Sequence, residues 1–309
     1  MKIADVLKKK MTFSFEVFPP KEDDGVPKLQ NELRELFRFN PDFISCTYGA
    51  GGTNVGKSKE ICKFITDNKV TCMTHFTCIG NTKREIKEIV QSYIDLGLEN
   101  VLAMRGDFPK DSETGKLKTT TGGDFEHANF LIEYLRGLFP RLGISCAGYP
   151  EKHILAPSFD SDIAFLKAKQ DAGADFIMLQ LCHDVDAYCR FRDKCHKAGV
   201  RLPQVMGLMP VLARDPIINM TVSNGCSIPP ELAAIIGKYT PANGAPENVV
   251  KEMAADFKKA GMEYTVKELW RYMAAGVEGI HIYALNKSAD VAKIVLDAGV
   301  SARLPVREN

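Results

Sequence analysis

The sequence lacks the features that define several large classes of protein. It has no apolar run of the roughly 20 residues that a membrane span requires. Its 40 Lys and Arg nearly balance its 39 Asp and Glu, for a net charge of +1, so it has no positive field to hold nucleic acid. The first residues, Met1–Asp5, carry an acid where a signal peptide would need an apolar stretch. These absences favour a cytoplasmic protein without a membrane span or a nucleic-acid partner.

Metal and disulfide signatures are also missing. None of the nine cysteines has the Cys-x-x-Cys spacing typical of zinc and iron–sulfur sites. No cluster of His, Asp and Glu has the spacing of metal ligands. An odd number of scattered thiols does not suit a secreted disulfide framework. Because Cys46, Cys72 and Cys146 lie in apolar runs, we expect buried reduced thiols and no bound metal.

What the sequence does contain is a regular alternation of two apolar patterns. Stretches with helical spacing recur, most clearly at Lys83–Leu96, Glu126–Leu138, Asp162–Ala172 and Asp186–Ala198. The last two are followed by glycine, which is typical of a helix C-cap. Short runs rich in β-branched and aromatic residues lie between the helices and predict strands. The predicted strands are Thr12–Phe18, Phe43–Tyr48, Thr71–Phe76, Val101–Met104, Ile144–Tyr149, Phe176–Leu181, Gln204–Met209 and Gly279–Ala284.

This alternation predicts an α/β fold, because strands separated by helices form parallel sheets and eight of them close a barrel. We expect one domain, residues 1–309, folded as a single (β/α)8 TIM barrel. The stretch Asn219–Tyr264 is longer than one crossover needs and predicts extra helices, Pro230–Lys238 and Glu247–Ala260, between strands seven and eight. An open doubly wound sheet is the alternative, but no Gly-x-Gly-x-x-Gly follows the first strand.

Polar residues recur at the carboxyl ends of the predicted strands, where barrels of this kind carry their sites. Glu16 is the most informative of them. Strand alternation places Phe15 and Val17 on one face and Glu16 on the other, toward the barrel mouth. A carboxyl desolvated among aromatic residues should have a raised pKa and could act as a general acid near neutral pH. The alternative is a structural ion pair with Lys or Arg.

Other strand-end residues carry weaker signals. Gly106 allows close approach of the backbone to a ligand, and Asp107 presents a carboxylate. The segment Gly49–Thr53 could cradle phosphate or form a plain turn. His75 stands alone at a strand end, where a structural histidine is more common than a ligand. Three further histidines are expected to be mostly solvated: His127, His183 and His196.

Taken in order, these segments resemble the methylenetetrahydrofolate reductase family over nearly the whole chain. Each predicted strand contributes a landmark, so the ordered set is far more specific than any single tripeptide. The landmarks are Phe13–Pro20, Thr47–Ala50, Thr74–Cys78, Arg105–Asp107, Tyr149–Glu151, Asp171–Ala174 leading to Gln180, Gly207–Pro210, and His281 to Asn286.

The resemblance implies a flavoprotein of folate, one-carbon and methionine metabolism that reduces 5,10-methylenetetrahydrofolate to 5-methyltetrahydrofolate. In that family reaction Glu16 would protonate N10 and open the folate ring to a 5-iminium cation, and Asp107 would favour that cation by its charge. Substrate contacts would come from Glu16, Gln180, Tyr283 and Lys287. The cofactor would be FAD, with FMN as the alternative. Its expected contacts are Thr47, His75, Arg105, Gly106, Asp107, His127, Ala128, Tyr149, His153, Asp162 and Lys169.

The sequence departs from the family pattern in three places. Pro216 and Met220 stand where members that use a nicotinamide have Gln and Phe, and Leu181–His183 replaces an aromatic run. His127 replaces a common Tyr. The electron donor is therefore left open between NAD(P)H and an iron–sulfur subunit, and we expect an oligomer or hetero-complex. Three alternatives to a self-contained reductase remain: the catalytic flavin subunit of a larger electron-transfer complex, a folate-binding barrel that transfers methyl groups without redox chemistry, and a non-catalytic scaffold.

Overall fold

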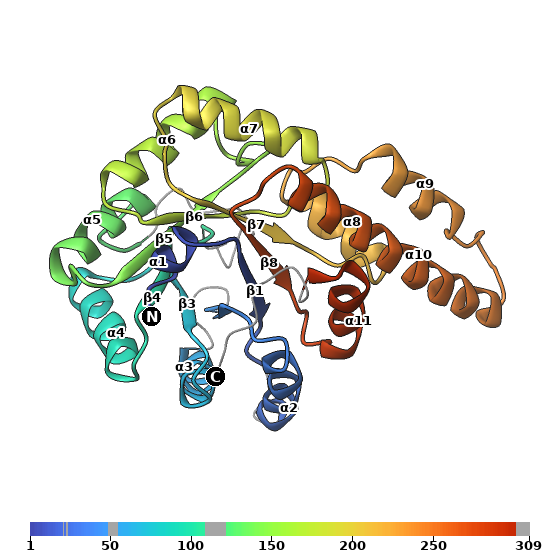
Figure 1. Cartoon of the computed structure of the whole chain (residues 1–309), viewed down its shortest axis with the longest axis horizontal. Helices are drawn as coiled ribbons and strands as arrows, with labels where there is room; N and C mark the ends of the chain where they lie inside the picture. The colour runs from blue at the N-terminus through green and yellow to red at the C-terminus, as the bar shows by residue number, and fades with distance from the viewer. Residues whose placement is uncertain (21, 23, 49–54, 109–121, 301–309) are drawn as a thin grey trace.

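The computed structural model describes residues 1–20, 22, 24–48, 55–108 and 122–300. Within these residues eight parallel strands follow one another around a closed barrel, and β8 pairs with β1 (Figure 1). The predicted barrel is thus confirmed, with every strand within two residues of its predicted bounds, and closure rules out the open sheet. The strands are β1 (Thr12–Val17), β2 (Phe43–Cys46), β3 (Cys72–Thr77), β4 (Asn100–Met104), β5 (Gly143–Gly148), β6 (Phe176–Leu179), β7 (Gln204–Leu208) and β8 (Gly279–Tyr283).

Helices surround the barrel and cover its outer face (Figure 1). Phe13, Phe15 and Val17 of β1 belong to the apolar core between strands and helices, as their alternation predicted. The predicted C-caps are also confirmed, because Gly173 and Gly199 have φ values of +105° and +79°. The barrel helices are α2 (Gly25–Phe37), α3 (Val55–Asp67), α4 (Lys83–Asp95), α5 (Ala128–Leu138), α6 (Phe159–Asp171), α7 (Val185–Lys197) and α11 (Ser288–Ala298).

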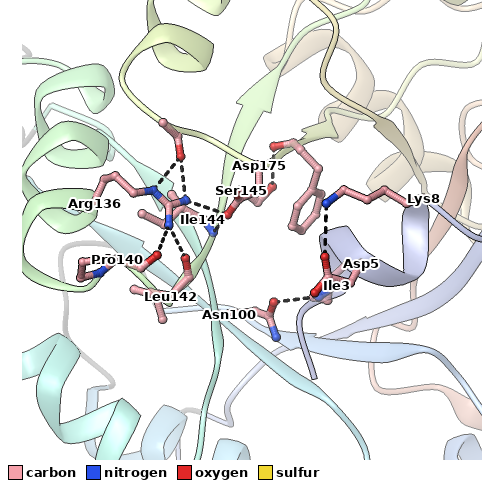
Figure 2. Close-up of polar contacts among 12 residues, drawn as sticks. Ile3, Asp5, Lys8, Asn100, Arg136, Pro140, Leu142, Ile144, Ser145 and Asp175 are labelled. Carbon is pink, nitrogen blue, oxygen red and sulfur yellow. Dashed lines mark hydrogen bonds and ion pairs between the residues drawn. The ribbon is translucent and has the colours of Figure 1, made fainter.

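The amino-terminal end of the barrel is closed by α1 (Ile3–Leu7), which the sequence analysis did not predict. Its Ile3, Ala4 and Leu7 join the apolar cluster inside the barrel, together with Phe43 and Phe176. The Ile3 amide donates to Asn100 Oδ1 at 3.0 Å, which fixes the helix to the start of β4 (Figure 2). Apolar side chains from α1 and the strands therefore close this end of the barrel interior.

A second set of polar contacts at the amino-terminal end is made by Arg136 of α5 (Figure 2). Its guanidinium donates to the Gly173 carbonyl and, at 2.7 Å, to Asp175 Oδ2. The same carboxylate oxygen accepts the Ile144 amide at 2.8 Å. A planar fork of donors suits this arrangement of carbonyl and carboxylate oxygens. The contacts join α5, β5 and the start of β6, so they stabilise the barrel away from the mouth.

Three helices lie between β7 and β8: α8 (Arg214–Ser223), α9 (Pro230–Lys238) and α10 (Glu247–Ala274). The last two are the predicted extra helices, and α8 was not predicted. The expected end of the last helix at Ala260 is wrong. Gly261 does not terminate the helix but allows close packing, because an added Cβ would collide with the Val211 carbonyl. No helix among the described residues combines the length and the apolar character of a membrane span.

Candidate active site

The carboxyl end of the barrel holds a buried polar layer centred on Glu16. The side chain lies inside the barrel, as its alternation predicted, and the residue is only 8% exposed. Its Oε2 accepts a hydrogen bond from Ser45 Oγ at 3.4 Å and lies 3.3 Å from His75 Nε2. His281 Nε2 is 3.5 Å from the same oxygen. Glu16 therefore faces histidines, and not the Lys or Arg of the structural alternative.

His281 is held by hydroxyl groups on two neighbouring strands. Ser14 Oγ lies 2.7 Å from Nδ1, and Ser45 Oγ lies 2.9 Å from Nε2. The ring stacks on Phe43 at 5.4 Å between centroids and is fully buried. The sequence analysis named His281 only as a landmark of the resemblance and did not single out Ser45. The signal that could have found His281 is its register, because it pairs with Ser14 on the strand that carries Glu16.

The predicted rise in the pKa of Glu16 is wrong. Burial does raise the pKa, but the charge of His75, together with hydrogen bonds from His281 and Ser45, lowers it below the ordinary value overall. The pKa of His75 is also lowered, by its burial, although the Glu16 charge opposes this. The sequence analysis treated the barrel mouth as aromatic surroundings, whereas the immediate neighbours of the carboxylate are polar groups that favour its charged form. The carboxylate is therefore the resting form of Glu16.

The turn after β4 requires its glycine. Gly106 has a φ of +91°, and an added Cβ would lie 2.8 Å from Ile79 Cγ2. Arg105 Nε donates to the Gly106 carbonyl at 3.1 Å, and its guanidinium lies 4.2 Å from the centroid of the Phe108 ring. The turn leaves Asp107 exposed. The sequence analysis placed the carboxylate at the end of this strand, and the turn presents it to solvent there.

The ends of β5 and α6 bring together several expected cofactor contacts. The rings of Tyr149 and His153 meet edge to face at 4.5 Å, and the His153 amide donates to Asp162 Oδ2 at 2.8 Å. Lys169 Nζ donates to the Ala147 carbonyl at 2.8 Å and lies 6.0 Å from the centre of the Tyr149 ring. These contacts fix one aromatic, one imidazole and one ammonium group in a small region.

The electrostatics connect this group to the turn after β4. Burial raises the pKa of Tyr149, and the charges of Asp162 and Asp107 raise it further, while Arg105 opposes them. Burial lowers the pKa of His153, the charge of Asp162 opposes this most, and the charge of Asp107 opposes it to a smaller extent. Charges from the turn after β4 thus reach the side chains at the ends of β5 and α6.

Gln180 and Tyr283 meet across the mouth. The Tyr283 hydroxyl donates to Gln180 Oε1 at 3.2 Å. Burial raises the pKa of Tyr283 strongly, and the charge of Glu16 adds to the effect. Glu16 and Tyr283 also pair in register between β1 and β8. Tyr283 thus lies next to the buried carboxylate, and Gln180 contacts Tyr283.

The three remaining expected flavin contacts are His127, Ala128 and Thr47. His127 is exposed, and its ring lies 6.3 Å from that of Phe130. Ala128 is the first residue of α5. Thr47 follows β2, where its amide donates to the Val17 carbonyl at 3.1 Å. The segment Gly49–Thr53 proposed as a phosphate cradle lies outside the described residues.

Lys287 is exposed and lies beside a cavity of about 550 Å³ between α8 and the end of β8. This cavity has mostly apolar walls with a few polar groups. Its lining residues are Met209, Pro216, Asn219, Met220, Ser223, Leu285 and Lys287. Pro216 and Met220, the positions at which the sequence departs from nicotinamide-using members of the family it resembles, therefore face a cavity at the barrel mouth.

The expectation that His183 is solvated is wrong, whereas His127 and His196 are exposed as expected. His183 Nδ1 lies 2.9 Å from Glu268 Oε1, and both side chains are only 1% exposed. Burial lowers the pKa of His183, but the charge and hydrogen bond of Glu268 raise it above its ordinary value overall. The sequence could not indicate this pairing, because the partner comes from the distant helix α10. His183 therefore joins β6 to α10 and does not line the mouth.

Two further expectations concern cysteine and metal chemistry. All nine cysteines are free, and Cys46, Cys72 and Cys146 are buried as predicted. Among the described residues no group of three or more His, Cys, Asp or Glu side chains is arranged to hold a metal ion. The described site consists of one buried carboxylate, imidazoles, hydroxyls and peripheral cations.

Comparison with known proteins gives a consistent result. The profile of the methylenetetrahydrofolate reductase family matches residues 2–299. The chain is 31% identical over 318 residues to methylenetetrahydrofolate reductase (NADH) 1 of Arabidopsis thaliana, covering 97% of this chain and 51% of that protein. It is 30% identical over 292 residues to 5,10-methylenetetrahydrofolate reductase of Buchnera aphidicola subsp. Schizaphis graminum, covering 92% and 93%. The chain spans about half the length of the first curated relatives it matches.

A solved structure supports the architecture. It is described as an uncharacterized protein from Clostridium thermocellum that binds two copies of 5-methyl-5,6,7,8-tetrahydrofolic acid. The two folds superpose with a TM-score of 0.61 over 98% of this chain and 100% of the other, at 12% sequence identity. At that identity the likeness concerns the fold alone.

Proposed function

The chain belongs to the methylenetetrahydrofolate reductase family, and we propose that it reduces 5,10-methylenetetrahydrofolate to 5-methyltetrahydrofolate with the help of a bound flavin. The observation that carries the proposal is the position of Glu16, a buried carboxyl held between His75 and His281 at the carboxyl end of the barrel. The decisive experiment follows the anaerobic oxidation of methyltetrahydrofolate by the purified protein with an artificial electron acceptor. A flavin-loaded protein without this activity would overturn the proposal.

The described side chains suit a flavin dinucleotide. Arg105 and Lys169 supply cations, and Lys169 uses only one of its three N–H groups on the Ala147 carbonyl. Tyr149 offers an aromatic surface flanked by His153. The first amides of α5, at Ala128, receive no side-chain cap, which leaves donors for an anion. We propose that Thr47, His75, Gly106, Asp107, His127 and Asp162 complete this binding surface.

Within the proposed reaction the flavin supplies hydride chemistry, and the protein supplies proton transfer, orientation and charge. In the reducing direction Glu16 must first take up a proton, because its resting form is the carboxylate. It then donates that proton to N10 of the folate as the ring opens to the 5-iminium cation. Asp107 stabilises that positive charge. Gln180 and Tyr283 orient the pterin, and Lys287 meets the glutamate tail. In the reverse direction Glu16 accepts the N10 proton, a role for which a carboxylate resting form is already prepared.

We expect the purified protein to bind flavin. The set of cations, imidazoles and aromatic surface at the ends of β4, β5 and α6 motivates this prediction. An absorption spectrum should show flavin bands that bleach on reduction with dithionite, and FAD is favoured over FMN. A colourless protein that takes up neither flavin on reconstitution would contradict the prediction and favour the methyl-transfer alternative.

The lowered pKa of Glu16 predicts a shift in pH dependence. Removing an imidazole with His75→Asn removes a charge that lowers this pKa, so the pKa of Glu16 should rise. Protonation would then begin at higher pH, and the acidic limb of methyltetrahydrofolate oxidation should move to higher pH. The pH profile of kcat/KM in flavin-loaded variants measures the shift. A limb that stays in place or moves to lower pH would mean that His75 does not set the charge state of Glu16.

The electron donor is a separate proposal. Pro216 and Met220 line the cavity beside α8 without an aromatic face, so a stacked nicotinamide loses roughly 0.5–1.5 kcal/mol of ring interaction. His183, where family members tend to have aromatic residues, is buried against Glu268. We propose that electrons come from a separate iron–sulfur subunit, which makes this chain part of a hetero-complex. NAD(P)H remains the alternative donor, because the lost interaction is small.

The isolated chain should therefore reduce its flavin poorly with NADH or NADPH. Anaerobic stopped-flow mixing with each nucleotide measures the bleaching rate. Dye-linked oxidation of methyltetrahydrofolate by the same preparation serves as the control that the flavin site is intact. Flavin bleaching faster than folate turnover would show that the chain needs no donor subunit.

The prediction of one domain over residues 1–309 stays a prediction.

A further inference from the structure

Gln180 is the centre of a chain of hydrogen bonds that continues away from the barrel. Its Nε2 donates to Asn224 Oδ1 at 2.9 Å, and Asn224 Nδ2 donates to the Met220 carbonyl at 2.8 Å. On the other side, Gln180 Oε1 accepts from the Leu181 amide at 2.8 Å and from the Tyr283 hydroxyl at 3.2 Å. Asn224 is the residue after α8 and comes from outside the barrel strands.

Backbone groups at the two ends determine the direction of this chain. A carbonyl only accepts, so the Asn224 atom facing Met220 must be nitrogen, and its oxygen must face Gln180. An amide N–H only donates, so the Gln180 atom facing Leu181 must be oxygen. Both constraints give the same orientation, which removes the usual ambiguity between the two ends of an amide side chain.

The orientation limits what Gln180 can offer a ligand. Its oxygen already accepts two hydrogen bonds, the number its lone pairs allow, while its nitrogen has one hydrogen left after donating to Asn224. Gln180 is therefore a hydrogen-bond donor toward the mouth. A ligand that presents an acceptor, such as the carbonyl oxygen or an unprotonated ring nitrogen of a pterin, complements it.

The segment that carries Asn224 is anchored on both sides of Gln180. Cys226 Sγ donates to the Leu181 carbonyl at 3.1 Å. The Ser227 amide donates to the Glu151 carboxylate at 3.1 Å, beyond the end of β5. These contacts hold the segment after α8 against the loops of β5 and β6, so Asn224 has a fixed position from which to orient Gln180.

We propose that Asn224 is a positioning residue that fixes Gln180 as a donor to an acceptor atom on the pterin. The proposal deepens the proposed reductase function and rests on it. Asn224 touches Gln180 and not the substrate, so its contribution passes through that side chain. Its loss should weaken substrate binding without altering the acid Glu16 or the flavin contacts.

Asn224→Ala is the test variant, measured in the full flavin-loaded chain by dye-linked oxidation of methyltetrahydrofolate. Asn68→Ala is the matched control, because Asn68 follows α3 and also donates to the carbonyl four residues earlier, that of Phe64. We expect KM for methyltetrahydrofolate to rise about 3-fold to 10-fold in Asn224→Ala, the effect of one neutral hydrogen bond, with kcat and flavin content unchanged. The control should match the wild type.

A double-mutant cycle separates positioning from general destabilisation. In a Gln180→Ala background, Asn224→Ala should have no further effect on KM, because the side chain it orients is gone. Asn224→Asp should not restore the wild-type KM, because a carboxylate cannot donate to the Met220 carbonyl. Effects of Gln180→Ala and Asn224→Ala that multiply independently would overturn the positioning role while leaving the reductase function intact. A wild-type protein that binds flavin but not methyltetrahydrofolate would overturn both.

Discussion

Glu16→Gln should lower folate turnover by about 10²–10⁴-fold while leaving flavin binding intact, the range typical of general acid–base catalysis. The substitution keeps the size of the side chain and a carbonyl oxygen that can still accept from Ser45, at 3.4 Å in the wild type. It removes the ionisable group that must carry a proton to N10 before the folate ring can open. The same loss should appear in the oxidative direction, because an amide cannot accept the N10 proton. Single-turnover mixing of reduced enzyme with methylenetetrahydrofolate measures the step directly.

A buried carboxyl elsewhere in the fold provides the control for this prediction. Glu268 is also buried against a histidine, His183, but it lies on α10 and faces the segment after β6. Glu268→Gln removes a comparable charge pair and should cost stability, since a broken buried pair leaves its partner uncompensated. Activity per folded, flavin-loaded molecule should stay close to that of the wild type. If Glu16→Gln retained full turnover, or if both variants lost it equally, Glu16 would not be the acid.

The direction of Glu16 was predictable from sequence because the strand period is two and leaves only two faces. Phe13, Phe15 and Val17 had to face the helices, so Glu16 faced the interior, and the structure agrees. Barrel closure was predictable for a related reason, since eight strands alternating with helices have few other arrangements.

The charge state of Glu16 was not predictable in the same way. It depends on His75 and His281, whose strands reach β1 only through the register of the closed sheet. The local sequence pattern indicates that a carboxyl is buried, and burial raises its pKa. The pattern does not identify the neighbouring groups that lower that pKa. The pair His183 and Glu268 was missed for the same reason. Asn224 was missed because its role comes from a loop packed against β6, and no periodic pattern specifies such a contact.

Some helix ends could be predicted from the local sequence and others could not. The turns at Gly173 and Gly199 were predictable because a positive φ favours glycine locally. Gly261 also follows an alanine, but the helix continues through it to Ala274. Glycine is needed there because of a tertiary contact, the close approach of the Val211 carbonyl. Local stop signals therefore need the packing partner before they can be distinguished from contact sites.

Asp107→Asn should reduce folate turnover by about 10²–10³-fold, provided that fixed charge beside the forming cation dominates its contribution. The turn at Gly106 holds Asp107 at the mouth, where its charge already acts on Tyr149 and His153. A neutral amide of the same size keeps the shape and removes the charge. Rapid-quench measurement of methylenetetrahydrofolate reduction, at saturating substrate and with pre-reduced flavin, isolates this step from the electron donor.

The position of the charge can be tested separately from catalysis. The charge of Asp107 adds a smaller contribution to the pKa of His153 than that of Asp162, so Asp107→Asn should lower that pKa slightly further below its ordinary value, as NMR titration of the imidazole would report. Asp124→Asn is the control, because Asp124 is also exposed but accepts from the Lys83 amide at the start of α4. It should leave both the titration and the turnover unchanged. A shifted pKa of His153 with undiminished turnover would mean that Asp107 lies where the structure has it but does not stabilise the cation. The charge that favours ring opening would then have to come from elsewhere in the site.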